Sequence, residues 1–212
     1  MGRDHEGAEA VTEDYDLEYR FIETQSETDY ETNINTCVEE GFDVVITVGF
    51  LIQDATLHAA IENPDIYFVG VDQVGADTVD EDGNVVEEAP DNFVGLQFRE
   101  DQAGFLAGAL AALVADSVGS DFIAGVYGID VPAVKKFRNG YEQGAMYINP
   151  DINVEGVYID DFLAPDRGAS AAEQFIGEGA SVIFGAGGPT GSGGIVAAAQ
   201  QDVFVIGVDQ DE

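Results

Sequence analysis

The chain has 212 residues, 45% of them hydrophobic, which is enough for one large domain or for two lobes of about 100 residues each. Seven Lys and Arg against 42 Asp and Glu give a formal net charge of −35 at pH 7. Because no basic stripe is present to meet phosphates, this composition excludes nucleic acid as a partner. The acidic residues are spread over the whole chain, and salt screens their repulsion. We therefore interpret them as adaptation to a salt-saturated, halophilic environment rather than as a surface for one basic partner.

In chain order, the first half alternates predicted helices and strands. Helical patterns cover residues 7–12, 30–40 and 54–62, and apolar runs predict strands over 18–23, 44–48, 66–71 and 93–98. Between the last two strands, Asp82-Gly83 indicates a surface hairpin or long turn. We place a crossing between two lobes just after Phe98, which divides the chain into an N-terminal lobe, 1–98, and a C-terminal lobe, 99–212.

The second half continues the same alternation. Strongly helical patterns cover 101–115, 132–148 and 167–177, and short apolar runs predict strands over 122–127, 154–159, 182–184 and 203–206. The first of these helices is rich in Gly and Ala, which permit close packing against a neighbour. Strands that alternate with helices in this way indicate an α/β fold with parallel sheets.

A stretch near the end of the chain, 179–210, resembles an earlier stretch, 41–73. Each consists of an apolar run, a loop, a helical pattern and a second apolar run that ends in Gly-Val-Asp-Gln, with Asp72 and Asp209 as the closing aspartates. The runs at 182–184 and 203–206 are typical of strands buried on both faces of a parallel sheet, and ligands bind beyond the carboxyl ends of such strands. Two lobes that face each other would point both carboxylates into one cleft, where they could accept hydrogen bonds from ligand hydroxyls. Alternatively, each aspartate only caps its own strand.

Three further features are candidates for ligand contact. The glycine-rich loop 185–194 joins a strand to a helix, but it lacks the Walker lysine, the dinucleotide spacing and the serine-nucleophile spacing. It is either a tight turn or a loop whose amides approach a ligand. Phe162 lies in an otherwise polar strand-to-helix loop, where it either anchors the loop or offers a ring for stacking. Phe50 is a weaker candidate of the same kind.

Signals for an enzyme are poor. The two histidines, His5 and His58, lie far apart in sequence and lack the partners that a metal site or a nucleophile–base pair would need. Cys37 is the only cysteine, so no internal disulfide can form. We therefore expect no enzymatic activity, no cofactor and no metal site.

Several motifs, in their order and spacing, resemble one known family. They are Gly-Phe-Asp-Val-Val-Ile-Thr-Val-Gly-Phe at 41–50, Asn-Phe-Val-Gly-Leu-Gln-Phe-Arg-Glu at 92–100, Phe-Arg-Asn-Gly-Tyr-Glu-Gln-Gly-Ala at 137–145, Thr-Gly-Ser-Gly at 190–193 and Ile-Gly-Val-Asp-Gln-Asp at 206–211. Together they resemble the BMP family, the PnrA-like substrate-binding lipoproteins of ABC transporters that receive purine nucleosides. The resemblance implies a type I periplasmic-binding-protein fold with two doubly wound parallel-sheet lobes. It also implies that the family's first strand and its closing C-terminal elements lie outside this sequence.

The resemblance further implies a site and a role. By position, Asp72 and Asp209 correspond to polar ligand contacts, Phe162 to one of two aromatics that sandwich the base, and Gly188 to a backbone contact. The implied function is capture of a nucleoside in an interlobe cleft and its delivery to an ABC permease. We expect the receptor to be monomeric, extracytoplasmic and, in its full-length form, a membrane-anchored lipoprotein. The alternative is the ligand-sensing domain of a regulatory protein, which shares this fold but would need a DNA-binding or kinase module.

Overall fold

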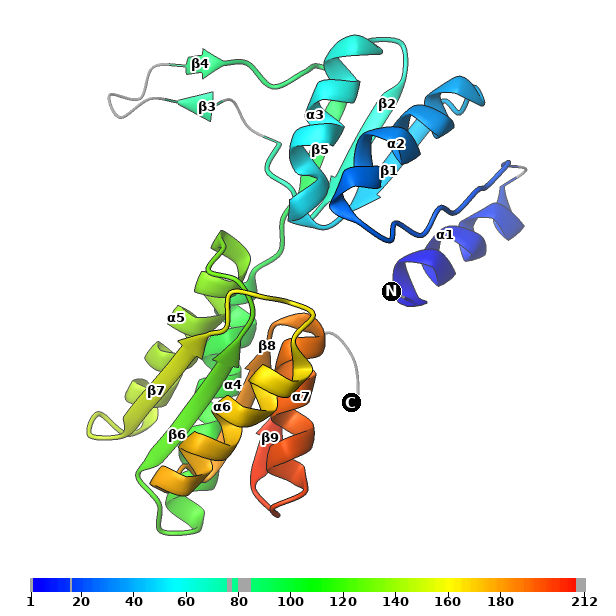
Figure 1. Ribbon diagram of the computed structural model, residues 1–212. Helices are drawn as coiled ribbons and strands as arrows, with labels where there is room; N and C mark the ends of the chain where they lie inside the picture. Colours follow the sequence, from blue (N-terminus) through cyan, green and yellow to red (C-terminus); the bar gives the residue numbers. More distant parts are fainter. Residues whose placement is uncertain (1, 16, 76–77, 80–84, 209–212) are drawn as a thin grey trace. The chain divides into compact units, whose positions relative to one another are not determined.

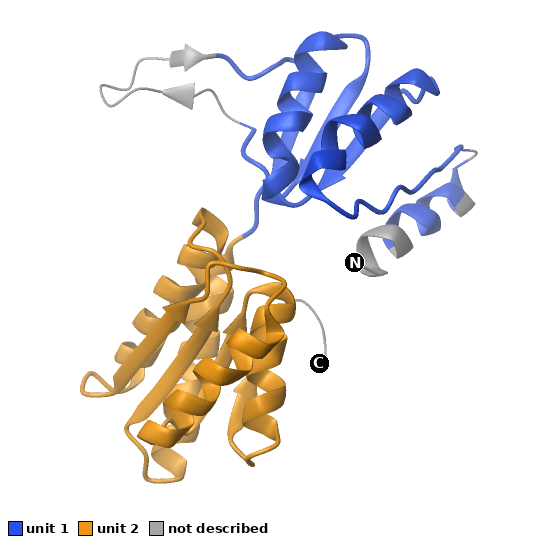
Figure 2. Cartoon of the chain, in the orientation of Figure 1, with its two compact units in different colours: residues 1–98 blue, residues 99–212 orange. Residues whose placement is uncertain are grey.

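The computed structural model describes residues 2–15, 17–75, 78–79 and 85–208 (Figure 1). The chain divides into two compact units, residues 1–98 and residues 99–212 (Figure 2). Each unit has its own parallel sheet and its own buried apolar residues. Within the described residues, no helix is both long enough and apolar enough to cross a membrane.

Unit 1 is built on a three-stranded parallel sheet in the order β1-β2-β5. Its elements are α1 (Gly2–Asp14), η1 (Glu27–Asp29), α2 (Tyr30–Glu39), β1 (Val44–Val48), η2 (Phe50–Ile52), α3 (Gln53–Glu62), β2 (Tyr67–Val71), the antiparallel pair β3 (Thr78–Val79) and β4 (Val85–Glu87), and β5 (Phe93–Leu96). The predicted strand over 18–23 is wrong. A strand needs a hydrogen-bonded neighbour, and none of the described strands pairs with this segment.

Helices α2 and α3 cover one face of this sheet. The core on that face comprises Ile34, Val45, Ile52, Ala59, Ala60, Phe68 and Phe93. Along β1 the burial alternates, so that Val45 and Thr47 point into the core while the side chains of Val44, Ile46 and Val48 are 47–58% exposed. The alternation follows from the strand's period of two residues, because α2 and α3 pack against one face of the sheet.

Unit 2 is a larger parallel sheet in the order β7-β6-β8-β9, which confirms the predicted α/β class. Its elements are α4 (Glu100–Ser117), β6 (Phe122–Tyr127), α5 (Pro132–Ile148), β7 (Asn153–Tyr158), α6 (Pro165–Glu178), β8 (Val182–Ala186), α7 (Gly188–Ala199) and β9 (Phe204–Ile206). The helices and strands predicted by residue range in this half are present, with bounds shifted by at most two residues. The predicted loop 185–194 is wrong for most of its length, because α7 already begins at Gly188.

Helices cover both faces of the central strands in unit 2. Figure 1 shows α6 and α7 in front of the sheet and α4 behind it. All residues of β6 and β8 are buried, as their continuous apolar character predicts. The same prediction is wrong for β9, where Phe204 is 51% and Val205 37% exposed. The cause is its place at the end of the strand order, where packing on its two faces is less complete.

Glycines bring α4 and α5 into backbone contact. A Cβ atom on Gly104 or Gly108 of α4 would overlap the α5 backbone, and one on Gly140 or Gly144 of α5 would overlap the α4 backbone. The close helix packing predicted from the small residues of 101–115 is therefore confirmed.

The internal repeat predicted from the sequence corresponds to two βαβ units with the same pairing. In unit 1, β1 and β2 are parallel neighbours joined through α3, and Val44 pairs with Tyr67. In unit 2, β8 and β9 are parallel neighbours joined through α7, and Val182 pairs with Phe204. In unit 1 β2 includes Gly70 and Val71 and ends just before Asp72, and in unit 2 β9 ends just before Gly207 and Val208.

Candidate functional site

Three strand ends of unit 2 meet at Gly128, which directly follows β6. The Gly128 amide donates to the carbonyl of Ala186 at the end of β8 (3.3 Å), and the Gly128 carbonyl accepts from Ile159 and Asp160 after β7 (both 3.1 Å). Gly187 lies so near that a Cβ atom on it would be 2.7 Å from the Gly128 Cα atom. The loops after β6, β7 and β8 therefore form one continuous edge at the carboxyl ends of the sheet.

The ring of Phe162 lies on this edge, directly over Gly128. A Cβ atom at position 128 would lie 2.5 Å from Cδ1 of Phe162, so only glycine leaves space for the ring. The ring is half-buried and packs against the apolar cluster formed with α4 and α5. Phe162 is thus an anchor of its loop, and it also places an aromatic ring at the sheet edge where ligands bind in this class of fold.

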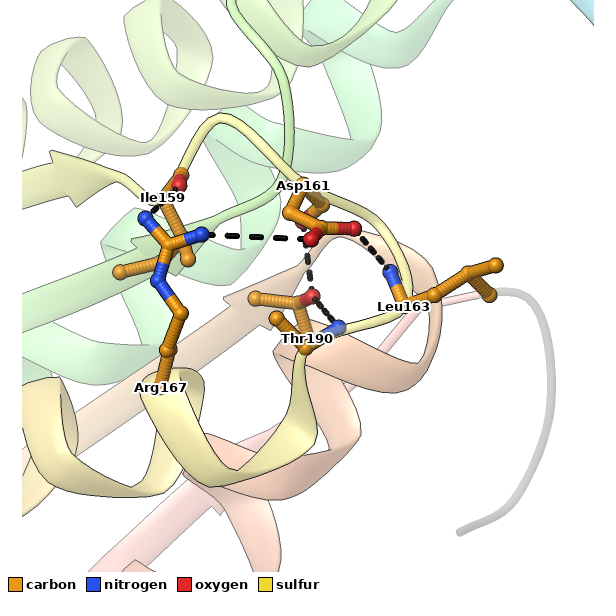
Figure 3. Close-up of polar contacts among 6 residues, drawn as sticks. Ile159, Asp161, Leu163, Arg167 and Thr190 are labelled. Carbon is orange, nitrogen blue, oxygen red and sulfur yellow. Dashed lines mark hydrogen bonds and ion pairs between the residues drawn. The ribbon is translucent and has the colours of Figure 1, made fainter.

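Thr190, in the first turn of α7, holds the Phe162 loop from the other side (Figure 3). Its hydroxyl donates to the carbonyl of Asp161 (2.7 Å) and accepts from the amide of Ala164 (3.0 Å). Its backbone amide donates to the carbonyl of Phe162 (3.1 Å). Thr190 is fully buried, so these bonds are protected from competition with water.

Asp161 and Arg167 shape the same loop locally. The carboxylate of Asp161 accepts from the Leu163 amide (2.8 Å), and the Arg167 guanidinium donates to the carbonyl of Ile159 (2.5 Å). Arg167 also approaches Asp161 at 3.9 Å, as Figure 3 shows, but both side chains are about half exposed, which makes the ion pair weak. Asp160 has a left-handed backbone with φ 60° and an exposed side chain. The paired aspartates thus lie where the chain bends between β7 and α6.

Gly188 lies beside Phe162 at the start of α7. A Cβ atom on Gly188 would be 3.8 Å from Cδ1 of Phe162, and its φ of 55° favours glycine. Among the described residues no side chain caps the N-terminus of α7, and residue 189 is a proline, which has no amide hydrogen. Two predicted site residues, Phe162 and Gly188, are therefore neighbours at an exposed helix start that suits acceptor atoms.

In unit 1, Asp72 lies at the carboxyl end of β2, where the sequence placed it. It is exposed, and its φ of 59° is unusual for a residue other than glycine. The next residue, Gln73, is fully buried and donates to the Thr47 hydroxyl (2.9 Å) and to the carbonyl of Gly49 (3.0 Å). The chain thus turns through a left-handed residue at Asp72, which is exposed, and the next side chain, Gln73, is buried.

Sequence reasoning missed the supporting roles of Gln73 and Thr190. For Gln73 a signal exists, because Gly-Val-Asp-Gln occurs in both halves. Gly70 leaves the space that the Gln73 side chain fills, since a Cβ atom on Gly70 would be 2.5 Å from Cδ of Gln73. For Thr190 the sequence shows only a threonine in a glycine-rich loop, which gives no sign of its partners.

Phe50, the weaker aromatic candidate, begins η2 directly after Gly49 and is half-buried.

Asp209 lies outside the described residues. The described part of unit 2 contains hollows. One of about 230 Å³ is lined by Ala103, Ala107, Phe137, Phe184, Gly207 and Val208, and a shallower one lies between α6 and α7. Neither includes Asp72, Phe162 or Gly188 among its lining residues.

In the described ranges, no group of three or more His, Cys, Asp or Glu side chains is arranged to hold a metal ion.

Comparison with known proteins identifies the family. A family model described as "ABC transporter substrate-binding protein PnrA-like" matches residues 3–212. The CD4+ T-cell-stimulating antigen of Listeria monocytogenes is 30% identical over 201 residues, which are 92% of this chain and 52% of the relative. Basic membrane protein B of Borreliella burgdorferi is 35% identical over 185 residues, covering 86% of this chain and 51% of the relative. The chain thus spans about half the length of these curated relatives.

A solved structure shows the same fold. The ABC transporter solute-binding protein of Aeropyrum pernix K1 is 26% identical with a TM-score of 0.76, over 95% of this chain and 55% of that chain. The type I periplasmic-binding-protein fold expected from the sequence is therefore confirmed. Both the family and the fold are those of solute-binding proteins and not of enzymes. The chain belongs to the PnrA-like family of ABC transporter substrate-binding proteins.

Proposed function

We propose that this protein is the solute receptor of an ABC transporter and that its solute is a purine nucleoside. Family membership supports the receptor role. We choose a purine nucleoside as the solute because Phe162 lies beside Gly188 at the carboxyl edge of the unit 2 sheet. An aromatic ring suits a flat base, and the amide of Gly188 suits an acceptor atom on it.

Carboxylates would complete the site by binding the sugar. Asp72 is exposed at the end of β2, and an ionised carboxylate only accepts hydrogen bonds, which suits the hydroxyl groups of ribose. The repeat assigns the same role to Asp209 in unit 2. A nucleoside that bridged the two units would favour a closed state through the contacts it makes to both.

Family membership also supports a wider role that we propose. A receptor of this kind would work outside the cytoplasm, held at the membrane by a lipid anchor, and would pass its solute to a permease as a monomer. Binding would require no cofactor and would make or break no covalent bond.

The proposal is tested by calorimetric titration and thermal shift in concentrated KCl with inosine, guanosine, adenosine, ribose and glucose. We expect a nucleoside at about 100 times its Kd to add about 2.7 kcal/mol to the free energy of unfolding. Asp72→Ala should weaken binding, whereas Asp202→Ala is the matched control, because Asp202 has the same left-handed backbone and an exposed side chain but precedes β9, at the amino end of that strand. Binding of a sugar but of no nucleoside would contradict the choice of solute. An unchanged Kd in Asp72→Ala would remove Asp72 from the site.

A further inference from the structure

We infer that Thr190 is a positioning residue for Phe162, because its hydroxyl fixes the loop that carries the ring to the start of α7. The inference rests on the proposed function, in which the Phe162 ring stacks on the base. It adds a residue for which neither the sequence pattern nor the family comparison supplies a role.

The contacts of Thr190 bracket Phe162 on both sides along the chain. The hydroxyl donates to the carbonyl of Asp161, the residue before the ring, at 2.7 Å. It accepts from the amide of Ala164, two residues after the ring, at 3.0 Å. The Thr190 amide donates to the carbonyl of Phe162 itself at 3.1 Å. One fully buried residue of α7 therefore binds the backbone at three points along a four-residue segment (Figure 3).

The other side-chain hydrogen bonds described for this loop are local, and the backbone bonds of Ile159 and Asp160 to Gly128 join the loop to the end of β6 rather than to α7. Asp161 and Leu163 are two positions apart, and Ile159 and Arg167 are eight positions apart on either side of the loop. These bonds give the loop its shape but do not join it to α7. The hydrogen bonds of Thr190 span 26 and 29 positions, so they determine where the ring lies relative to Gly188 and the helix start.

The hydroxyl and the methyl group of Thr190 can be tested separately. Only a hydroxyl both donates and accepts at this place, so Val would keep the shape while leaving the Asp161 carbonyl and the Ala164 amide without their partner. The methyl group packs near Gly168, where a Cβ atom would lie 3.3 Å from Cγ2 of Thr190. Ser would keep both hydrogen bonds and lose only this packing.

The experiment compares the wild-type protein with Thr190→Val, Thr190→Ser and Thr56→Val. Amide hydrogen exchange at Ala164 and the Kd for inosine are measured in each. Thr56 is the matched control because it is also fully buried, and its hydroxyl bonds to Thr47 (2.8 Å) and Ile52 (2.9 Å) in unit 1. We expect Thr190→Val to speed exchange at Ala164 and to weaken inosine binding, each by about tenfold. Thr190→Ser should restore both values, and Thr56→Val should leave exchange at Ala164 unchanged.

Two results would overturn the inference. One is unchanged exchange at Ala164 in Thr190→Val, which would show that the loop holds its place without the hydroxyl. The other is equal loss of inosine affinity in Thr190→Ser and Thr190→Val, which would assign the effect to packing. If the wild-type protein binds no inosine while Ala164 exchange responds as expected, the proposed function fails and the placement of the loop by Thr190 is supported.

Discussion

A Cβ atom on Gly108 of α4 would lie only 2.7 Å from the carbonyl carbon of Tyr141 on α5. The same relationship recurs in the opposite direction, where a Cβ atom on Gly144 would lie 2.8 Å from the carbonyl carbon of Phe105. The two helices therefore touch through their backbones, and this contact forms the layer behind the unit 2 sheet.

Gly108→Ala should destabilise unit 2, because the neighbouring atoms belong to a helix backbone that cannot rotate away. Overpacking of this kind lowers the free energy of unfolding by about 1–3 kcal/mol. Gly177→Ala is the control: it lies in α6, where a Cβ atom would meet nothing within 4 Å. Relief of glycine's entropy cost should make the control slightly stabilising, by about 0.5–1 kcal/mol. Urea denaturation measures both, and equal effects of the two variants would refute the packing argument.

The hydroxyl of Tyr141 is fully buried and has no hydrogen-bond partner in the described part of the chain. Removing it in Tyr141→Phe should therefore leave the melting temperature at neutral pH unchanged or raise it, since an unpaired buried polar group costs about 1–3 kcal/mol. Tyr147→Phe is the control on the same helix, with a 76% exposed ring, and should change nothing. A clear loss of stability in Tyr141→Phe would show that the hydroxyl has a partner.

Burial raises the pKa of Tyr127 and of Tyr141 above the ordinary value of 10.0. In the folded state both phenols stay neutral while those of the unfolded chain ionise, so their contribution to stability is present below about pH 10 and is lost as the pH rises further. Each phenol lowers the free energy of unfolding by about 1.4 kcal/mol per pH unit in that range. Denaturation at pH values above 10 should show a shallower decline in Tyr141→Phe than in the wild-type protein, and an identical decline would contradict this assignment.

The net charge of −35 should make stability depend strongly on salt. Between about 0.1 M and about 1 M salt the Debye length falls from about 10 Å to about 3 Å, which screens repulsion among the acidic side chains. We propose that the protein is adapted to high salt and expect its melting temperature to rise throughout this range, equally in NaCl and KCl. A melting temperature independent of salt would argue against the adaptation.

Much of the fold could be predicted because local signals agree with the final packing. The helix over 132–148 begins at a proline and ends before Asn149-Pro150, and the observed α5 has the same bounds. The strand predicted over 18–23 failed because an extended apolar pattern does not show whether a pairing partner exists. Burial of β9 failed for a similar reason: its apolar sequence matches that of β8, but β9 lies at the end of the sheet order. Both failures concern long-range neighbours, which local patterns do not report.

The places of the candidate residues relative to the strands could be predicted, but the groups that support them could not. Asp72, Phe162 and Gly188 do follow the carboxyl ends of β2, β7 and β8, and their role in binding stays a prediction. The repeated Gly-Val-Asp-Gln motif singles out Gln73 but not its partners, and no pattern singles out the Thr190 hydroxyl, because the partners of both are mostly backbone groups of other loops. Backbone carbonyls and amides have the same chemistry at every position, so the sequence gives no sign of which ones will be paired.

Amide hydrogen exchange with and without saturating inosine tests the central claim most directly, because it reports on both units at once. If a nucleoside binds the strand ends of each unit as proposed, it should slow exchange at residues 72–74 in unit 1 and at 160–164, 187, 188 and 190 in unit 2. Ribose at the same concentration should slow exchange less, since it has no base to stack on Phe162. Slower exchange confined to one unit, or no change in either, would contradict the account.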